Sequence, residues 1–96
     1  MLKTFEKFLY DNHRGKGKAV TSKELERTFK CRSVDIREMV NQLRCNAVPL
    51  CSCTRGYFYA ENNFDVEDTI IHLNGRIKRI KDARDGLERF LRKDSC

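Results

Sequence analysis

The residues of this chain best suited to chemistry are three polar side chains on one face of a predicted helix. Arg37, Asn41 and Arg44 are spaced by four and three residues, so they share one side of that helix. Arg and Asn side chains form paired hydrogen bonds with phosphates or with base edges in the major groove of DNA. Arg32 and Ser33 stand at the entrance of the same helix. These residues favour nucleic-acid recognition, although an ordinary surface helix can carry them too.

The opposite face of this helix, predicted over residues 33–46, is apolar. Its stripe follows the i, i+3, i+4, i+7 spacing of a helix packed on a core and consists of Ile36, Met39, Val40 and Leu43. Ser33 is the expected N-cap residue, and Asp35 in the first turn suits the positive end of the helix dipole. Asn46 is expected to adopt the left-handed conformation that often ends a helix.

The net charge of +6 is confined to the first part of the chain. Residues 1–60 contain 12 Lys and Arg against 6 Asp and Glu, whereas residues 61–96 contain 8 of each kind. This asymmetry favours a polyanionic partner for the first part and a different role for the second. The chain has no apolar run long enough for a transmembrane helix and no secretory signal, so we expect a cytoplasmic protein that does not contact membranes.

The five cysteines do not form a recognisable site. Cys51 and Cys53 are separated by one residue, whereas paired zinc ligands at a turn usually have two between them. We therefore expect reduced thiols and no metal, and any role of Cys51 and Cys53 stays open. No nucleophile–base motif, glycine-rich phosphate loop or paired carboxylates occur, so we expect neither an enzyme nor a cofactor.

Two helices and a basic loop are predicted before the polar helix. Residues 1–12 form an amphipathic helix, and the glycines that follow it break the pattern. Lys16 and Lys18 in this loop either lie along a phosphate backbone or are simply solvated. Thr21 and Glu24 form a capping box that starts the second helix at Ser22. The short connection between the second and third helices is typical of a helix-turn-helix unit.

A β-hairpin is predicted after the third helix. Residues 48–53 alternate as a strand, with Pro49 marking an edge, and the aromatic run 57–60 is the return strand. Arg55 lies at the tip, in the turn that ends with Gly56. We expect Tyr57 and Tyr59 to face the core and Phe58 to be left on the other face.

With these residues identified, the run from Thr21 to Ala60 resembles the winged helix-turn-helix of the biotin-ligase repressor class. The resemblance rests on Thr21–Leu25, Ile36, Val40, Leu43, Arg44, Val48, Gly56 and Tyr57. The longer pattern also looks like small prophage-encoded proteins of this type. The resemblance implies a recognition helix in the major groove and a wing on the backbone or in the minor groove. It extends these roles to Arg32, Ser33, Arg37, Asn41, Arg44 and Arg55. One departure is Ala47, where the family usually has Gly.

The last third of the chain predicts a long helix with a heptad stripe. Its apolar positions are Val66, Ile70, Leu73, Ile77, Ile80, Leu87 and Leu91, interrupted only by Arg84. A helix of this span is about 40 Å long, so part of it should project from the body. It either pairs with a second copy, parallel or antiparallel, or folds back over the first helix. Gly75 and Gly86 either admit a close neighbour or mark a break.

These patterns predict a mainly α fold with a small β-hairpin: a winged helix-turn-helix over residues 1–62 and a long helix over residues 63–96. The expected function is sequence-specific binding of double-stranded DNA by a homodimer, as a transcriptional regulator or a phage replication or recombination accessory factor. The alternative is a protein-interaction module that acts through the last helix, because a fold does not determine a function. The sequence leaves open the DNA target and any effector.

Overall fold

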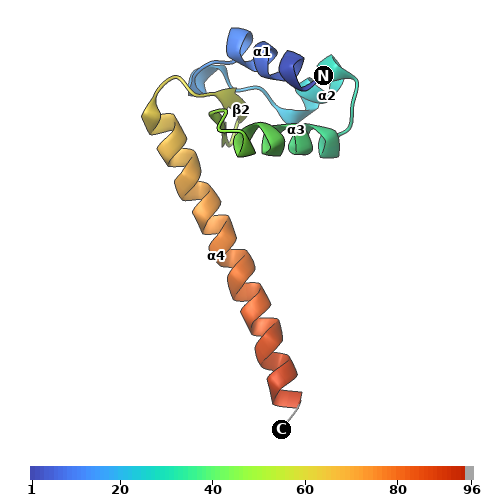
Figure 1. The fold of residues 1–96 in the computed structure, drawn as a ribbon, viewed down its shortest axis with the longest axis vertical. Helices are drawn as coiled ribbons and strands as arrows, with labels where there is room; N and C mark the ends of the chain where they lie inside the picture. The colour runs from blue at the N-terminus through green and yellow to red at the C-terminus, as the bar shows by residue number, and fades with distance from the viewer. Residues whose placement is uncertain (95–96) are drawn as a thin grey trace.

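The computed structural model describes residues 1–94 and confirms the mainly helical fold with one hairpin. Figure 1 shows a body of short elements from which one long helix extends. In chain order these elements are α1 (Leu2–Asn12), a 3-10 turn (Lys16–Lys18), α2 (Ser22–Phe29), α3 (Ser33–Cys45), β1 (Leu50–Cys53), β2 (Gly56–Tyr59) and α4 (Asn63–Asp94). The last two residues of the predicted second region, 63–96, lie outside the described residues.

The core of the body lies where α1, α2, α3 and the hairpin meet. Its buried side chains are Phe5, Leu9, Val20, Leu25, Ile36, Val40, Leu43 and Leu50. The rings of Phe5 and Phe29 pack with centroids 5.2 Å apart and join α1 to α2. The stripe predicted for the third helix therefore identified its core side correctly: Ile36, Val40 and Leu43 are buried, and Met39 packs against the core.

The helix starts agree with the sequence at α2 and differ at α3. The Glu24 backbone N–H donates to Thr21 Oγ1 at 3.2 Å, which is the predicted N-cap of α2. At α3 the prediction of Ser33 as N-cap was wrong, because Arg32 occupies that position. The Arg32 backbone N–H donates to the Asp35 carboxylate at 3.0 Å, so Asp35 satisfies the exposed donor from within the helix.

The end of α3 also differs from the prediction. Asn46 has φ −96° and is not left-handed, whereas Ala47 has φ 64°. The expectation for Asn46 was therefore wrong, and the left-handed residue stands where the resembling family usually has Gly. The Val48 backbone N–H donates to the Leu43 carbonyl at 2.9 Å, which holds the chain in this reversal. Ala47 adopts a conformation that is unfavourable for a residue with a Cβ atom.

We predict that Ala47→Gly stabilises the protein. Glycine removes the steric cost of positive φ, about 1 kcal/mol after allowance for the extra freedom of the unfolded chain. The free energy of unfolding from urea denaturation measures the effect. Ala60→Gly is the matched control, because Ala60 is not among the positive-φ residues and its substitution should be destabilising. A loss of stability in Ala47→Gly would contradict the left-handed end of α3.

The hairpin is attached edge-on to the segment that leads into α2. Cys53 pairs with Gly56 across the two-residue turn at Thr54 and Arg55. The backbones of Val20 and Tyr57 exchange two hydrogen bonds of 2.8 Å. The residue that precedes the N-cap of α2 therefore pairs with β2 in a single antiparallel bridge at the edge of the hairpin. Gly56 has φ 127°, and a Cβ atom there would collide with the Val20 carbonyl oxygen. A glycine is required at this position by both the backbone angle and the close approach.

The prediction that Phe58 is left exposed was wrong. Phe58 is 2% exposed and pairs across the hairpin with Cys51, which is 1% exposed. The first turns of α4 pack on β1, and Thr69 of α4 is itself 5% exposed. Burial raises the pKa of the Cys51 thiol, although its hydrogen bond with Thr69 acts in the opposite direction. The hairpin thus has two buried faces, and Tyr57 and Tyr59 are only half-buried on the core side.

Beyond this contact α4 leaves the body and does not fold back over α1 (Figure 1). The described chain is consequently elongated, with extents of 58 × 31 × 23 Å. Gly75 and Gly86 lie within one continuous helix, so neither marks a break. Within residues 1–94 no helix is long and apolar enough to cross a membrane.

Candidate nucleic-acid interface

Arg44 connects the predicted recognition helix to the hairpin. Its Nε donates to the Leu50 carbonyl at 2.9 Å, and a terminal nitrogen donates to Ser52 Oγ at 3.2 Å. The side chain is half-buried, and this burial lowers the pKa of Arg44 from its ordinary value; the charge of Arg76 lowers the same pKa. A guanidinium has five N–H donors, so Arg44 can hold β1 against α3 and still donate to a ligand.

We predict that Arg44→Ala destabilises the protein by about 1–3 kcal/mol, because two hydrogen bonds from a charged group are lost and the Leu50 carbonyl loses its side-chain donor. Arg37→Ala is the matched control on the same helix. Arg37 is exposed, so its removal should change stability by less than about 0.5 kcal/mol. Urea denaturation of both variants compares the effects. Equal stabilities would show that the contacts of Arg44 with β1 do not hold the hairpin.

A groove between α3 and α4 brings the three predicted base-reading residues together. It has a volume of about 430 Å³. Arg37, Asn41 and Arg44 line it from α3, and Arg76 lines it from α4. The remaining lining residues are apolar or aromatic: Val40, Tyr57, Leu73, Ile77 and Ile80. The face of α3 that was expected to read DNA therefore has α4 as a close neighbour.

A second groove adjoins the first at the base of the hairpin. It has a volume of about 340 Å³ and lies between the start of α2, the hairpin turn and α4. Arg55 of the turn lines it together with Arg44 and Arg76. Four hydroxyl-bearing residues also line it, Thr21, Ser22, Ser52 and Thr54, and the remaining lining residues are Cys53, Gly56 and Tyr57. Guanidinium and hydroxyl donors are the groups that proteins most often direct at phosphate oxygens.

Four arginines thus surround two adjoining grooves, and no Asp or Glu lines either groove. Arg37 and Arg44 come from α3, Arg55 from the hairpin turn and Arg76 from α4. The positive charges of the four arginines repel one another, and a bound anion would reduce this repulsion. Sequence reasoning missed Arg76, because the heptad pattern drew attention only to the apolar positions of α4.

The other predicted contact residues are spread around this surface. Lys16 lines a shallow hollow with Ser52, Cys53 and Thr54 of the hairpin, so the basic loop lies next to the hairpin. Lys18 is exposed in the same loop. Arg32 and Ser33 lie at the exposed start of α3, where Arg32 Nε lies 3.6 Å from the Asp35 carboxylate. The structure therefore places Arg37, Asn41, Arg44 and Arg55 together and leaves Arg32 and Ser33 at the far end of α3.

The exposed ridge of α3 is less basic than its flank. Val34, Glu38, Asn41 and Cys45 recur at helical spacing, and all four are exposed. Asn41 is the one member of this ridge that also lines the α3–α4 groove. An approaching DNA backbone would therefore be attracted to the arginine side of α3 and repelled by Glu38.

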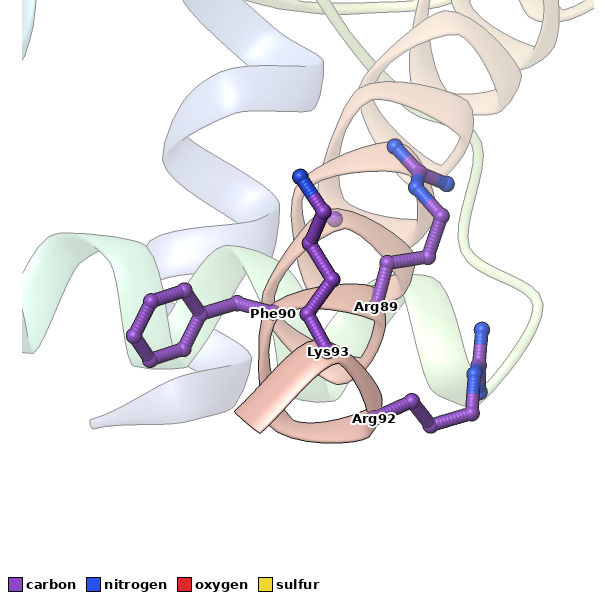
Figure 2. Close-up of a pocket in the computed structure, with 5 residues that line it drawn as sticks. Arg89, Phe90, Arg92 and Lys93 are labelled. Carbon is purple, nitrogen blue, oxygen red and sulfur yellow. The ribbon is translucent and has the colours of Figure 1, made fainter. Parts of the chain in front are cut away.

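The projecting end of α4 carries a separate cationic surface. Figure 2 shows Arg89, Arg92 and Lys93 extending from the last turns, with Phe90 pointing away from the two arginines. These residues and Gly86 border a shallow hollow on a single helix. No other element of the described chain contributes to it, so the hollow is open on its far side.

Among residues 1–94 no group of three or more His, Cys, Asp and Glu side chains is arranged to hold a metal ion. Comparison of the chain with protein-family models, with curated proteins and with solved structures finds no match in any of the three.

Proposed function

We propose that this protein binds double-stranded DNA through α3 and the hairpin. The observation that carries the proposal is the convergence of Arg37, Arg44, Arg55 and Arg76 around grooves that contain no acidic side chain. Phosphate contacts supply most of the affinity of such a surface, and base contacts supply the selectivity. Arg37 and Asn41 are the candidates for base contacts, because both lie in the groove and on the exposed part of α3.

The order of elements supports this proposal. Two short helices, a tight turn and a two-stranded hairpin agree with the winged helix-turn-helix that the sequence resembles. In that arrangement α3 enters the major groove, and the turn with Arg55 lies against the backbone. The basic loop with Lys16 and Lys18 then provides further backbone contacts beside the hairpin.

The test is fluorescence anisotropy of a labelled random duplex titrated with the full chain at two salt concentrations. Tight binding that weakens steeply with salt is expected, since each phosphate contact contributes about 0.9 to the logarithmic salt slope. No binding at low salt would overturn the proposal. A selection for the preferred site then provides the cognate duplex for the next measurement.

We predict different effects for a groove residue and a loop residue. Arg37→Ala should reduce the preference for the cognate duplex, because a good side chain–base pair contributes about 1–3 kcal/mol of discrimination. Lys18→Ala should weaken binding to all sequences alike and lower the salt slope by about 1. Titration of each variant with cognate and random duplexes separates the two effects. Equal losses on both duplexes from both variants would refute this division of roles.

A second candidate function is a protein-interaction module. The exposed apolar stripe of α4 favours it, because contiguous apolar side chains on a protein surface often mark interaction sites. Glu38 on the exposed ridge of α3 also favours it, since a carboxylate there repels phosphates. The anisotropy titration discriminates the candidates, because a pure interaction module does not bind duplex DNA at low salt.

A further inference from the structure

We infer that α4 pairs with α4 of a second copy in an antiparallel orientation, with Ile77 of each chain opposite Ile80 of the other. The inference concerns how two chains associate and needs no DNA. In this register Ile70 lies opposite Leu87, and Val66 lies opposite Leu91. Of the four kinds of seam pair, only Leu73 with Arg84 does not join two apolar side chains.

The seam is exposed to solvent in the projecting part of α4. Ile77 is 62% exposed and Ile80 is 68% exposed, and Leu87 and Leu91 are equally accessible. With Arg84 counted, the seam positions of the projecting part are spaced alternately by three and four residues, as in helices that supercoil with another helix. A stripe of this length on a helix that has left the body is matched best by another helix of the same length.

The charges of α4 favour a second copy in reverse orientation. Residues 63–75 contain three acidic residues and no Lys or Arg, whereas residues 76–94 contain eight Lys and Arg against four acidic residues. The helix dipole explains such charges only in the first and last turns, and Arg76, Lys78 and Lys81 lie far from both ends. An antiparallel pair places the acidic part of each helix beside the basic part of the other. A parallel pair places like charges together along the whole rod.

The residues in and beside the seam give the same answer. In a parallel pair Arg84 faces the same arginine of the second copy in the seam, and Arg76 lies opposite Lys81. In the antiparallel pair Arg84 faces Leu73, Arg76 lies opposite Ala83, and Lys81 lies opposite Asn74. The antiparallel register therefore removes both repulsive contacts and leaves one like-charged flanking pair, Glu67 with Glu88.

The first turns of α4 border a recess beside β1 that fits the end of the second helix. Its volume is about 370 Å³, and its lining includes Val48, Pro49, Val66, Ile70 and Leu73. In the proposed register Leu87 and Leu91 of the second copy reach this recess, and Phe90 reaches the neighbourhood of Thr69. The ring of Phe90, which Figure 2 shows pointing away from the two arginines, then lies against the first turns of the partner's α4.

The test is photo-cross-linking of the full chain in reducing buffer without DNA, with p-benzoylphenylalanine in place of Phe90. The expected product is a covalent dimer of twice 11.3 kDa in which the label has reacted with residues 64–76 or 47–50 of the second copy. Attachment to residues 84–94 of the second copy would show a parallel pair and overturn the inference. Absence of any dimeric product would overturn it too, and neither result bears on DNA binding. The same label at Tyr10 on α1 should give no dimer.

Glu88→Lys provides a second, independent readout. In the antiparallel pair it turns the two Glu67–Glu88 repulsions into attractions, so sedimentation should show dimerisation about three- to tenfold tighter at low salt. In a parallel pair residue 88 lies opposite Ala83, and the dimerisation constant should hardly change. An unchanged or weaker dimer in Glu88→Lys would contradict the antiparallel register.

Discussion

Replacing Ile77 and Ile80 together with Asp is expected to make the protein monomeric and to weaken its binding to DNA with two half-sites by about a hundredfold or more. The substitutions place four carboxylates at the centre of the proposed seam, where each loses hydration without gaining a partner. Loss of the dimer removes the second, intramolecular binding event on such a duplex, which is commonly worth two to four orders of magnitude. Ile77 and Ile80 also line the α3–α4 groove, so anisotropy is measured on duplexes with one and with two half-sites, and only the loss confined to the two-site duplex is assigned to the lost dimer. Sedimentation equilibrium measures dimerisation on the same sample.

Ile71→Asp is the matched control for this variant. Ile71 is 66% exposed on the same helix but lies outside the heptad stripe. Its substitution should leave the dimer and its DNA affinity within about twofold of the parent protein, because an exposed position contributes little to either. A monomeric Ile71→Asp variant, or a dimeric Ile77→Asp/Ile80→Asp variant, would place the interface elsewhere. These substitutions are preferable to deleting α4, because its first turns pack on β1, where Cys51 is buried.

The second large effect is expected from removing the exposed groove arginines. The triple variant Arg37→Ala/Arg55→Ala/Arg76→Ala should bind random duplex DNA at least about a hundredfold more weakly at low salt, and its salt slope should fall by about 2.7. Three phosphate contacts of about 0.9 each account for that change in slope. Arg44 is left in place, because its removal would also loosen the hairpin. Anisotropy titrations at four salt concentrations give both quantities.

A triple variant with the same change in net charge separates local contacts from the overall field. Arg27, Lys30 and Arg79 are exposed and line none of the grooves described above. At a salt concentration of about 0.1–0.15 M their replacement by Ala should lower affinity only severalfold, since charges beyond a Debye length of about 8–10 Å are then screened. If both triple variants lose affinity equally, then DNA is attracted by net charge and the grooves are not its binding site.

The sequence predicted most of the local structure of this chain. The capping pair Thr21 and Glu24 determined where α2 begins, and the apolar spacing of α1 and α3 identified their buried faces. These features depend on residues within one or two helical turns of one another, so the order of residues is sufficient to reveal them. The two errors at the ends of α3 each misplace a feature by one residue. The N-cap is Arg32 and not Ser33, and the left-handed residue is Ala47 and not Asn46. Local sequence patterns locate helix ends only to within one or two residues.

The face of the hairpin that holds Phe58 was not predictable in the same way. Alternation places Phe58 opposite the two tyrosines, but it does not reveal whether another element covers that face. The first turns of α4 cover it, and α4 lies at the far end of a linker whose direction the sequence does not encode in any simple pattern. Alternation alone therefore predicts an exposed Phe58, whereas the residue is buried.

The candidate site likewise contains some residues that the sequence predicted and others that only the tertiary structure revealed. The sequence alone identified Arg37, Asn41, Arg44 and Arg55, because helical spacing and turn chemistry place them on one helix face and at one loop tip. The hydrogen bonds of Arg44 with β1 and the position of Arg76 in the same grooves became visible only in the tertiary structure. Both contacts depend on the angle at which distant segments pack. The apolar stripe of α4 was likewise predicted from its heptad spacing. The direction in which α4 projects from the body depends instead on how its first turns pack on β1. Local periodicity thus determined which residues share a face, and long-range packing decided which faces meet.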